Sequence, residues 1–367
     1  MPAQLTVVVL FGGRSSEHSV SCATAGGVLS AIDRSKYRVI PVGITRDGAF
    51  VLESDDPDRF AMTGELPSVI DTGSRVHWPE SAVSRELTVT EEGVTRSLGD
   101  VDVVFPILHG RFGEDGTVQG MLELLGLPYV GAGVLASSVG MDKHFTKTVL
   151  QASGIAVAPW VTVTESAWRR DPDRELTAID ALASNGSLYP LFVKPARAGS
   201  SVGVSKATDA ASLTEAIDTA LREDTKVLVE TAIVGREVEC AVLAGRDGGA
   251  PRVSVAGEII TPSGVFYDFE SKYLDADAAR LECPADLAPE QLAEMQDLAA
   301  HAFVAIDGSG LARVDFFLTA DGFVINELNT MPGFTPISMF PKCWMASGMS
   351  YPELLDELIT LGLETAR

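Results

Sequence analysis

The sequence is poor in cysteine and has no apolar run long enough to span a membrane. Its four cysteines are Cys22, Cys240, Cys283 and Cys343, and no two of them form a C-x-x-C pair. This wide spacing fits neither a disulfide framework nor a structural zinc site. The N-terminal apolar run has no basic segment before it and no cleavage pattern after it, so it predicts a strand rather than a signal peptide. We therefore expect a cytoplasmic protein.

Positive charge is also scarce. The chain has 28 Lys and Arg against 51 Asp and Glu, which gives a net charge of −23. Such a surface repels nucleic acids and anionic membranes, so we expect neither as a partner. A ligand that carries phosphate would need a local group of cations. Four of the few lysines lie in stretches that hold other candidate site residues, namely Lys143, Lys147, Lys194 and Lys272.

Hydrophobic residues make up 46% of the 367 residues, enough for two or three globular domains. Residues 5–13, 19–32 and 37–45 follow a strand, helix, strand pattern, and a second such set occupies residues 102–130. This order predicts a parallel sheet of the α/β class. Residues 45–98 are polar and weakly periodic, and we interpret them as an elaboration of this first domain.

A change in pattern near residue 140 predicts a second domain that begins with a helix over residues 141–154. Further elements are expected as strands at 188–195, 226–230 and 253–260 and as helices at 209–224, 289–306 and 351–364. Residues 261–286 are aromatic, charged and poorly periodic, which is typical of a functional loop or lid. Lys272 and Tyr273 lie in this segment, and the alternative is that they are ordinary exposed loop residues.

The segment RVDFFLTADGFVINELNT, residues 313–330, predicts a β-hairpin. With a two-residue turn at Asp321-Gly322, Asp315 and Glu327 would project from opposite faces. With a three-residue turn that starts at Ala320, they would face each other, and Arg313 would face Asn329 on the same side.

The three-residue turn would leave Val314, Phe316, Leu318, Val324 and Leu328 on the core face, and Asn326 would have no place in the pattern. Opposed carboxylates repel unless a cation lies between them, and ligands that offer only oxygen favour Mg²⁺. A surface hairpin with solvated charges is the alternative interpretation.

Three glycine-rich stretches are candidate ligand loops. FGGRSSEHS could present backbone N–H groups to an anion beside Glu17, or it could be a tight turn. GAGVLA has the form of a dinucleotide fingerprint, but Gln151 stands where the ribose-binding acid would lie. VKPARAGSSVG suits a loop that closes over phosphates, or it could be an ordinary polar turn.

Other polar residues follow predicted strands. His109 lies at the carboxyl end of a parallel strand, where open α/β sheets bind ligands, although a structural role is the alternative. Glu114 and Asp115 could cap the helix that begins at Thr117. Glu230 and Glu237 lie beyond a strand, as site residues or as solvated charges.

The order of these motifs carries a resemblance. GGRSSEHSVS, HGRFGEDGTVQG, MDK, VKPARAGSSVGVSK, YDFESKY, RVDFFL and NELNTMPGFTPISMFP occur in sequence over nearly the whole chain. Together they closely resemble D-alanine:D-alanine ligases of the ATP-grasp superfamily. Two features depart from the family: the insertion at residues 45–98, and Thr231, where many relatives carry Lys.

The resemblance implies an N-terminal parallel-sheet (pre-ATP-grasp) domain followed by an ATP-grasp fold of two α+β subdomains. The implied bounds are 1–139, 140–232 and 233–367, with a lid at about 258–286. It also implies ATP, two Mg²⁺ ions (or Mn²⁺), a homodimer, and ligation of two D-alanines through an acyl phosphate for peptidoglycan synthesis. The alternatives are a ligase for D-lactate or D-serine, an NAD-dependent oxidoreductase and a non-catalytic nucleotide-binding module.

The resemblance also assigns roles to single residues. By this resemblance, the metal ligands are Asp315, Glu327 and Asn329. The residues implied to bind the nucleotide are Lys143, Lys194, Ser201, Glu230, Ile233, Glu237, Lys272 and Asn326. Substrate binding falls to Glu17, His109, Ser338 and Met339. Arg313 and the backbone near Gly333 would stabilise the tetrahedral intermediate, and Ser200 and Tyr273 would hydrogen-bond toward Glu17. Because the lid keeps the SKY sequence, the resemblance favours the dipeptide over an ester product.

Overall fold

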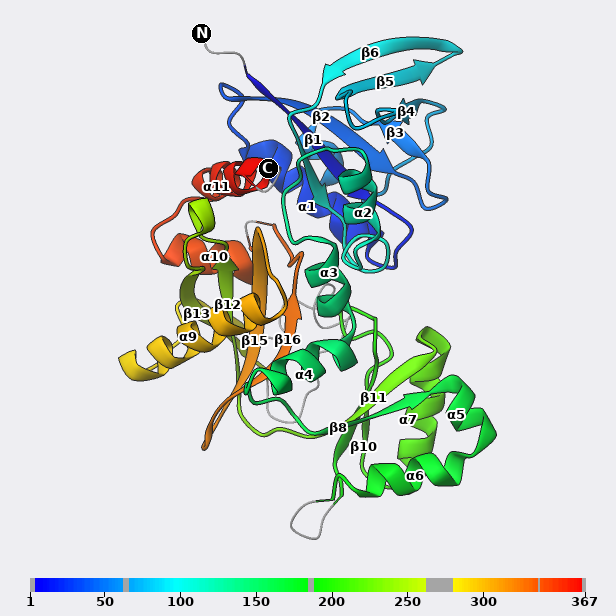
Figure 1. Ribbon diagram of the computed structural model, residues 1–367, viewed down its shortest axis with the longest axis vertical. Coiled ribbons are helices and arrows are strands. Elements are labelled where there is room, and N and C mark those ends of the chain that lie inside the picture. Colours follow the sequence, from blue (N-terminus) through cyan, green and yellow to red (C-terminus); the bar gives the residue numbers. More distant parts are fainter. Residues whose placement is uncertain (1–3, 62–65, 184–187, 262–279, 336, 365–367) are drawn as a thin grey trace.

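The computed structural model describes residues 4–61, 66–183, 188–261, 280–335 and 337–364. Three main sheets follow one another along the chain (Figure 1). We call them the N-terminal, central and C-terminal sheets. Lys272 and Tyr273 lie outside the described residues. No helix in the described ranges has the length and apolar character needed to cross a membrane.

The N-terminal sheet has the strand order β3-β2-β1-β7, and β1 runs parallel to both β2 and β7. Its elements are β1 (Leu5–Gly12), α1 (His18–Ala31), β2 (Tyr37–Ile44), β3 (Phe50–Leu52) and β7 (Val103–Ile107). Residues 6–12 of β1 are all buried because helices and the insertion cover both faces. The expected parallel sheet is confirmed.

The insertion adds η1 (Pro57–Phe60) and an antiparallel sheet of β4 (Arg75–His77), β5 (Glu86–Glu91) and β6 (Val94–Asp100). Leu87 and Val89 pack into the same core as Val8 and Leu10 of β1. The insertion therefore elaborates the first part of the chain, as expected. The strand expected at 127–130 is wrong, because Tyr129 makes only an isolated bridge to Val104.

Short helices then lead away from the N-terminal sheet, namely α2 (Thr117–Leu124), α3 (Val134–Met141) and α4 (Lys143–Ala152). The central sheet has the order β10-β9-β11-β8. Its strands are β8 (Trp160–Thr164), β9 (Leu191–Pro195), β10 (Ser205–Ala207) and β11 (Lys226–Thr231), with α5 (Glu165–Arg170), α6 (Pro172–Asp180) and α7 (Ala210–Glu223) beside them. The sequence reading missed β8, α5 and α6.

The C-terminal sheet has the order β14-β13-β12-β15-β16. Its strands are β12 (Arg236–Leu243), β13 (Arg252–Ile260), β14 (Arg280–Glu282), β15 (Leu311–Thr319) and β16 (Gly322–Asn329), and η2 (Arg246–Gly248) joins the first two. The helices are α9 (Pro289–Ala305), α10 (Met339–Ala346) and α11 (Tyr351–Glu364).

The two faces of β12 pack against different helices. Cys240 and Val242 share a core with α9, whereas Ala241 and Leu243 share a core with α10. Helix α9 buries Met295, Ala299, Ala302 and Phe303, and the helix expected at 289–306 is confirmed.

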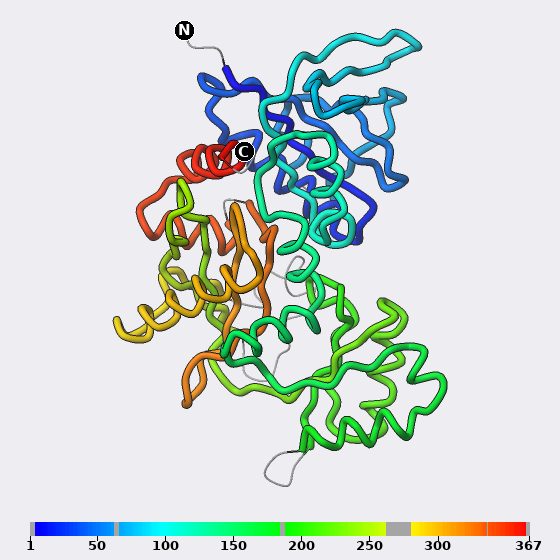
Figure 2. The backbone as a smooth tube through the Cα atoms, in the orientation of Figure 1, coloured from blue at the N-terminus to red at the C-terminus, as the bar shows by residue number. Residues whose placement is uncertain are grey.

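The last helix crosses back to the N-terminal sheet. Leu354, Leu358 and Leu361 of α11 share a core with Val103 and Phe105 of β7. Figure 2 shows this red helix beside the blue N-terminal segment. Contacts between the ends of the chain thus join the C-terminal part to the first sheet.

Candidate active site

A cavity of about 210 Å³ lies between the central and C-terminal sheets. Its lining includes eleven of the site residues expected from the sequence: Lys143, Lys194, Ser200, Ser201, Glu230, Ile233, Glu237, Arg313, Asp315, Asn326 and Glu327. They come from elements that are far apart in the chain. This convergence of polar side chains makes the cavity the candidate active site.

The hairpin of β15 and β16 supplies the acidic wall of the cavity. Thr319 pairs with Gly322, so the turn consists of Ala320 and Asp321 and is neither of the two turns expected. A β-bulge then shifts the register by one residue, and Asp315 faces Glu327 after all. The predicted pairing is confirmed, but the predicted three-residue turn is wrong.

Asn326 is the extra residue of this bulge. Phe316 pairs with Ile325, while Asp315 pairs with Glu327, so Asn326 has no partner of its own in the ladder. Its Oδ1 accepts a hydrogen bond from Lys194 Nζ at 3.2 Å. The bulge also reverses the expected faces near the turn. Phe323 and Ile325 are buried in the core and Val324 is not, which corrects the predicted core face.

Arg313 is held between carboxylates from two strands. Its Nε and one terminal nitrogen each donate to Asp315 at 2.7 Å, and Nε also forms an ion pair with Glu239 of β12. Burial lowers the pKa of Arg313, but Asp315 and Glu239 outweigh it and raise that pKa well above its usual value. The sequence reading missed Glu239, although its spacing of two from Glu237 on a strand places both on one face.

The donor set of the hairpin fits a hard cation. Asp315 and Glu327 face each other, and Asn329 Nδ2 donates to Asp315 Oδ2 at 3.0 Å, which leaves the amide oxygen of Asn329 as a possible metal ligand. Lys143 Nζ lies 3.5 Å from Glu327 Oε2. In the described ranges, no group of three His, Cys, Asp or Glu residues could hold a metal ion. An ion at the hairpin would therefore need further oxygen ligands from a bound ligand or from water.

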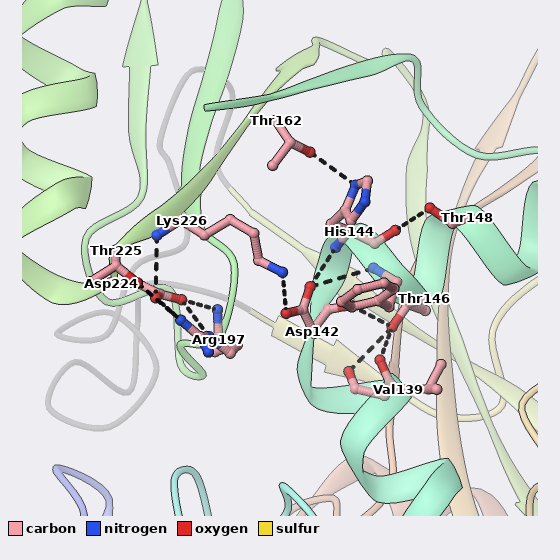
Figure 3. A network of polar contacts seen from close by, with 12 residues as sticks. Val139, Asp142, His144, Thr146, Thr148, Thr162, Arg197, Asp224, Thr225 and Lys226 are labelled. Carbon is pink, nitrogen blue, oxygen red and sulfur yellow. Dashed lines mark hydrogen bonds and ion pairs between the residues drawn. The ribbon is translucent and has the colours of Figure 1, made fainter. Parts of the chain in front are cut away.

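Helix α4 positions Lys143 at the cavity. Asp142 caps this helix by accepting from the backbone N–H groups of His144 and Phe145, and its carboxylate also binds Lys226 Nζ (Figure 3). The backbone N–H of Lys143 donates to Ala196 O at 3.0 Å. The start of α4 is therefore fixed to the central sheet.

Glu230 lies at the end of β11 with only 3% of its surface exposed. Its Oε2 is 2.9 Å from Lys194 Nζ, and its Oε1 is 3.3 Å from Lys147 Nζ. Burial would raise the pKa of Glu230, but the two lysines outweigh burial and lower it. The carboxylate is therefore ionised near neutral pH. The sequence reading noted Lys147 but gave it no role.

A second polar group surrounds Glu17, which precedes α1. Ser200 Oγ donates to Glu17 Oε1, as the resemblance implied. A Cβ atom built on Gly110 or on Gly199 would lie 2.8 Å from Glu17 Oε2, so the backbone at each of these glycines approaches the carboxylate closely. His109 Nδ1 lies 3.1 Å from Met331 O.

Glu114 belongs to this group and is not a helix cap. The N-cap residue of α2 is Gly116, and Asp115 before it accepts from Thr117 N at 3.0 Å, whereas Glu114 accepts from the backbone N–H of Gly110. Burial and then the charge of Glu17 raise the pKa of Glu114 to about 8. Burial lowers the pKa of His109. The sequence alone gave no signal for the burial of Glu114.

The three remaining predicted residues are Gly333 and Ser338, which precede α10, and Met339, which begins it; none of them lines the cavity. Ser338 Oγ lies 2.8 Å from Thr335 Oγ1, and a Cβ built on Gly333 would lie 3.2 Å from Ser338 Oγ. The Met339 side chain is buried in the core against Gly257. The expected role of Met339 in substrate binding stays a prediction.

GAGVLA has a packing role. Gly133 N donates to Ser309 Oγ at 3.1 Å, and a Cβ built on Gly310 would lie 2.6 Å from Gly131 O. The close approach of the two chain segments therefore depends on Gly310, while Gly131 has a φ of +119°, a conformation that favours glycine. These contacts give GAGVLA a packing role.

Comparison with known proteins identifies the family. Residues 6–132 match the family described as D-ala D-ala ligase N-terminus, and residues 149–360 match D-ala D-ala ligase C-terminus. The chain belongs to the D-alanine–D-alanine ligase family. It is 53% identical over 362 residues to the D-alanine–D-alanine ligase of Pseudarthrobacter chlorophenolicus, with 97% of this chain and 94% of the relative covered. The corresponding figures for the enzyme of Streptomyces avermitilis are 52% over 370 residues, with 99% and 95% covered.

Solved structures agree with the family assignment. The VanG D-Ala:D-Ser ligase of Enterococcus faecalis has a TM-score of 0.83 and 35% identity, with 98% of this chain and 100% of that chain covered. The D-alanine–D-alanine ligase of Coxiella burnetii has a TM-score of 0.78 and 36% identity, with 99% and 95% covered. The ATP-grasp fold expected from the sequence is therefore confirmed.

Proposed function

We propose that this chain uses ATP to join two D-alanines into D-alanyl-D-alanine, releasing ADP and phosphate, for peptidoglycan synthesis. Family membership supports the reaction. The observation that carries the proposal is that Asp315, Glu327, Lys143 and Lys194 line one cavity. Opposed carboxylates beside two lysines suit the phosphates and cations of a bound nucleotide.

The chemistry needs an activated carboxylate, because a free carboxylate is a poor electrophile. Transfer of the γ-phosphate gives an acyl phosphate, which the amine of the second substrate attacks. No nucleophilic side chain is required. Arg313 lies in the cavity wall, where its cationic head would stabilise negative charge on the reacting groups.

We propose that Asp315, Glu327 and Asn329 hold Mg²⁺ or Mn²⁺. The facing carboxylates and the amide oxygen fit such an ion, as described above. A bound divalent ion would neutralise phosphate charge. Lys143 and Lys194 would bind phosphate oxygens, Ser201 and Asn326 would lie nearby, and Glu230, Ile233 and Glu237 would bind the adenosine part of the nucleotide.

The amino-acid substrates are proposed to bind beside Glu17. Its carboxylate would accept the ammonium of the first D-alanine, with His109 nearby. Backbone groups around Gly333, Ser338 and Met339 would contact the reacting carbonyl and the second substrate. Lys272 and Tyr273 retain the roles that the resemblance implies, as proposals only.

We further propose domains over residues 1–139, 140–232 and 233–367, with one main sheet in each. A homodimer and a cytoplasmic location are proposed from the resemblance.

One assay tests the function. Purified protein is incubated with ATP, Mg²⁺ and D-alanine, and the product is identified by mass and by chiral analysis. Parallel reactions contain L-alanine, D-serine with D-alanine, or D-lactate with D-alanine. We expect ADP release that depends on D-alanine and yields the D,D-dipeptide. Preferential formation of the D-serine product would favour the activity named for the VanG neighbour. Absence of any amino-acid-dependent ADP release would refute the proposal.

A further inference from the structure

Lys147 is a buried lysine that the proposed chemistry does not use. Only 2% of its surface is exposed, and it does not line the cavity. Its ammonium lies 3.2 Å from the backbone oxygen of Ala158, 5.7 Å from the Trp160 ring centre and 3.3 Å from Glu230 Oε1. Taking an ammonium out of water costs several kcal/mol unless a partner compensates for it. Glu230 is therefore the reason that Lys147 can be charged at this position.

The two lysines beside Glu230 have different surroundings. Lys194 lines the cavity and also donates to Asn326, so a nucleotide phosphate could draw it away from the carboxylate. Lys147 lies behind Glu230 and has no access to the cavity. Its contact with Glu230 would therefore persist when a nucleotide is bound.

The two oxygens of Glu230 have different surroundings. Oε1 is buried and forms an ion pair with Lys147, whereas Oε2 lies beside Lys194, which lines the cavity. A carboxylate oxygen has more than one lone pair, so Oε2 can accept a second hydrogen bond from a ligand in the cavity. An ionised carboxylate accepts hydrogen bonds only, so a ligand that meets it must bring an N–H or O–H donor.

We infer that Lys147 is a positioning residue that fixes the Glu230 carboxylate as an acceptor and thereby makes the nucleotide site selective for a 6-aminopurine. The exocyclic amino group of adenine donates to Glu230. A 6-oxopurine presents an oxygen there, which an ionised carboxylate repels. The inference rests on the proposed nucleotide site. It extends that site by a residue that touches neither the nucleotide nor the substrates.

The test compares ATP with ITP, which differ at the 6 position of the purine ring. Lys147→Met removes the charge and keeps the length of the side chain. We expect the ratio of kcat/KM for ATP to kcat/KM for ITP to fall at least about tenfold, mainly through a higher KM for ATP. Saturating kcat with ATP should change less than about threefold.

Two further variants keep the test decisive. Lys147→Gln is neutral but can still donate to Ala158 O, and it is expected to lose selectivity in the same way. Lys147→Arg keeps the charge and should retain most of the wild-type ratio. Lys226→Met is the matched control, because Lys226 also binds an acidic residue of the α4 region, Asp142, but does not contact Glu230.

Combination with Glu230→Gln separates positioning from general damage. An amide can donate as well as accept, so Glu230→Gln alone should reduce the ATP preference. Adding Lys147→Met to it should then change the ratio by less than about twofold if Lys147 acts through Glu230. The inference would be overturned if soluble Lys147→Met and Lys147→Gln kept the wild-type ratio of kcat/KM for ATP to kcat/KM for ITP. Equal losses of kcat/KM with ATP and with ITP would have the same meaning. A wild-type protein that is inactive with ATP would instead overturn the proposed function.

Discussion

Replacing Ser200 by alanine should weaken D-alanine binding without disturbing the backbone. Ser200 Oγ donates to Glu17 Oε1, and 183 residues separate the two positions in the chain. Ser200 has a φ of +51°, a conformation that is strained for any residue with a Cβ atom. Alanine and serine bear this strain equally, so Ser200→Ala isolates the contribution of the hydroxyl group.

The size of the effect follows from the partner. Glu17 is only 7% exposed, so water replaces the lost donor poorly. A hydrogen bond to a charged group contributes about 1.5–3 kcal/mol, which corresponds to a loss of about 10- to 150-fold in kcat/KM for D-alanine. The KM for ATP should change far less, because the adenine end of the proposed site lies at Glu230.

ADP release measured against D-alanine concentration, at saturating ATP, gives this quantity. Ser200→Gly is the matched variant, because glycine also lacks the hydroxyl but relieves the strain at positive φ. Both variants should show the loss. A change of less than about threefold in Ser200→Ala, or a loss seen only in the KM for ATP, would refute the role of the Ser200–Glu17 contact.

Two further predictions concern ionised groups. Burial and the charge of Glu17 raise the pKa of Glu114 from its ordinary value of 4.5 to about 8 in the folded protein. Between these two pH values the folded state keeps a proton that the unfolded state has lost, so stability falls as pH rises through them. Glu114→Gln should reduce the fall in the free energy of unfolding with pH by at most about 1.4 kcal/mol per pH unit. Urea unfolding at pH 6 and pH 8 measures this difference. An equal fall in the variant and the wild-type protein would contradict the prediction. Asp315→Asn should raise the Mg²⁺ concentration for half-maximal ADP release at least about tenfold. The control Asp321→Asn, in the exposed turn, should leave this concentration unchanged. An unchanged concentration in Asp315→Asn would exclude Asp315 as a metal ligand.

The sequence predicted the elements that depend on local pattern. The parallel start of the chain and helix α9 both follow from periods of 2 or 3.6 residues. The family motifs located eleven of the residues that line the cavity. These features depend on neighbours in the chain, which a single sequence displays directly.

The turn of the hairpin shows where local pattern fails. A bulge at Asn326 and a turn one residue shorter than expected compensate each other, so the right pairing was reached through the wrong loop. Alternation cannot distinguish these two arrangements at the proposed metal site, because both place Asp315 opposite Glu327. The two arrangements place Val324 on different faces of the hairpin, and its face was predicted incorrectly.

Tertiary structure alone decided the contacts between distant segments. It placed Lys147 behind Glu230, Glu239 against Arg313, and α11 on the N-terminal sheet. The sequence by itself determined which residue types are present and which local periods favour a strand or a helix. Which buried charge meets which partner is decided only when the sheets close on one another, because removing a charge from water is tolerated where a partner is already held in place.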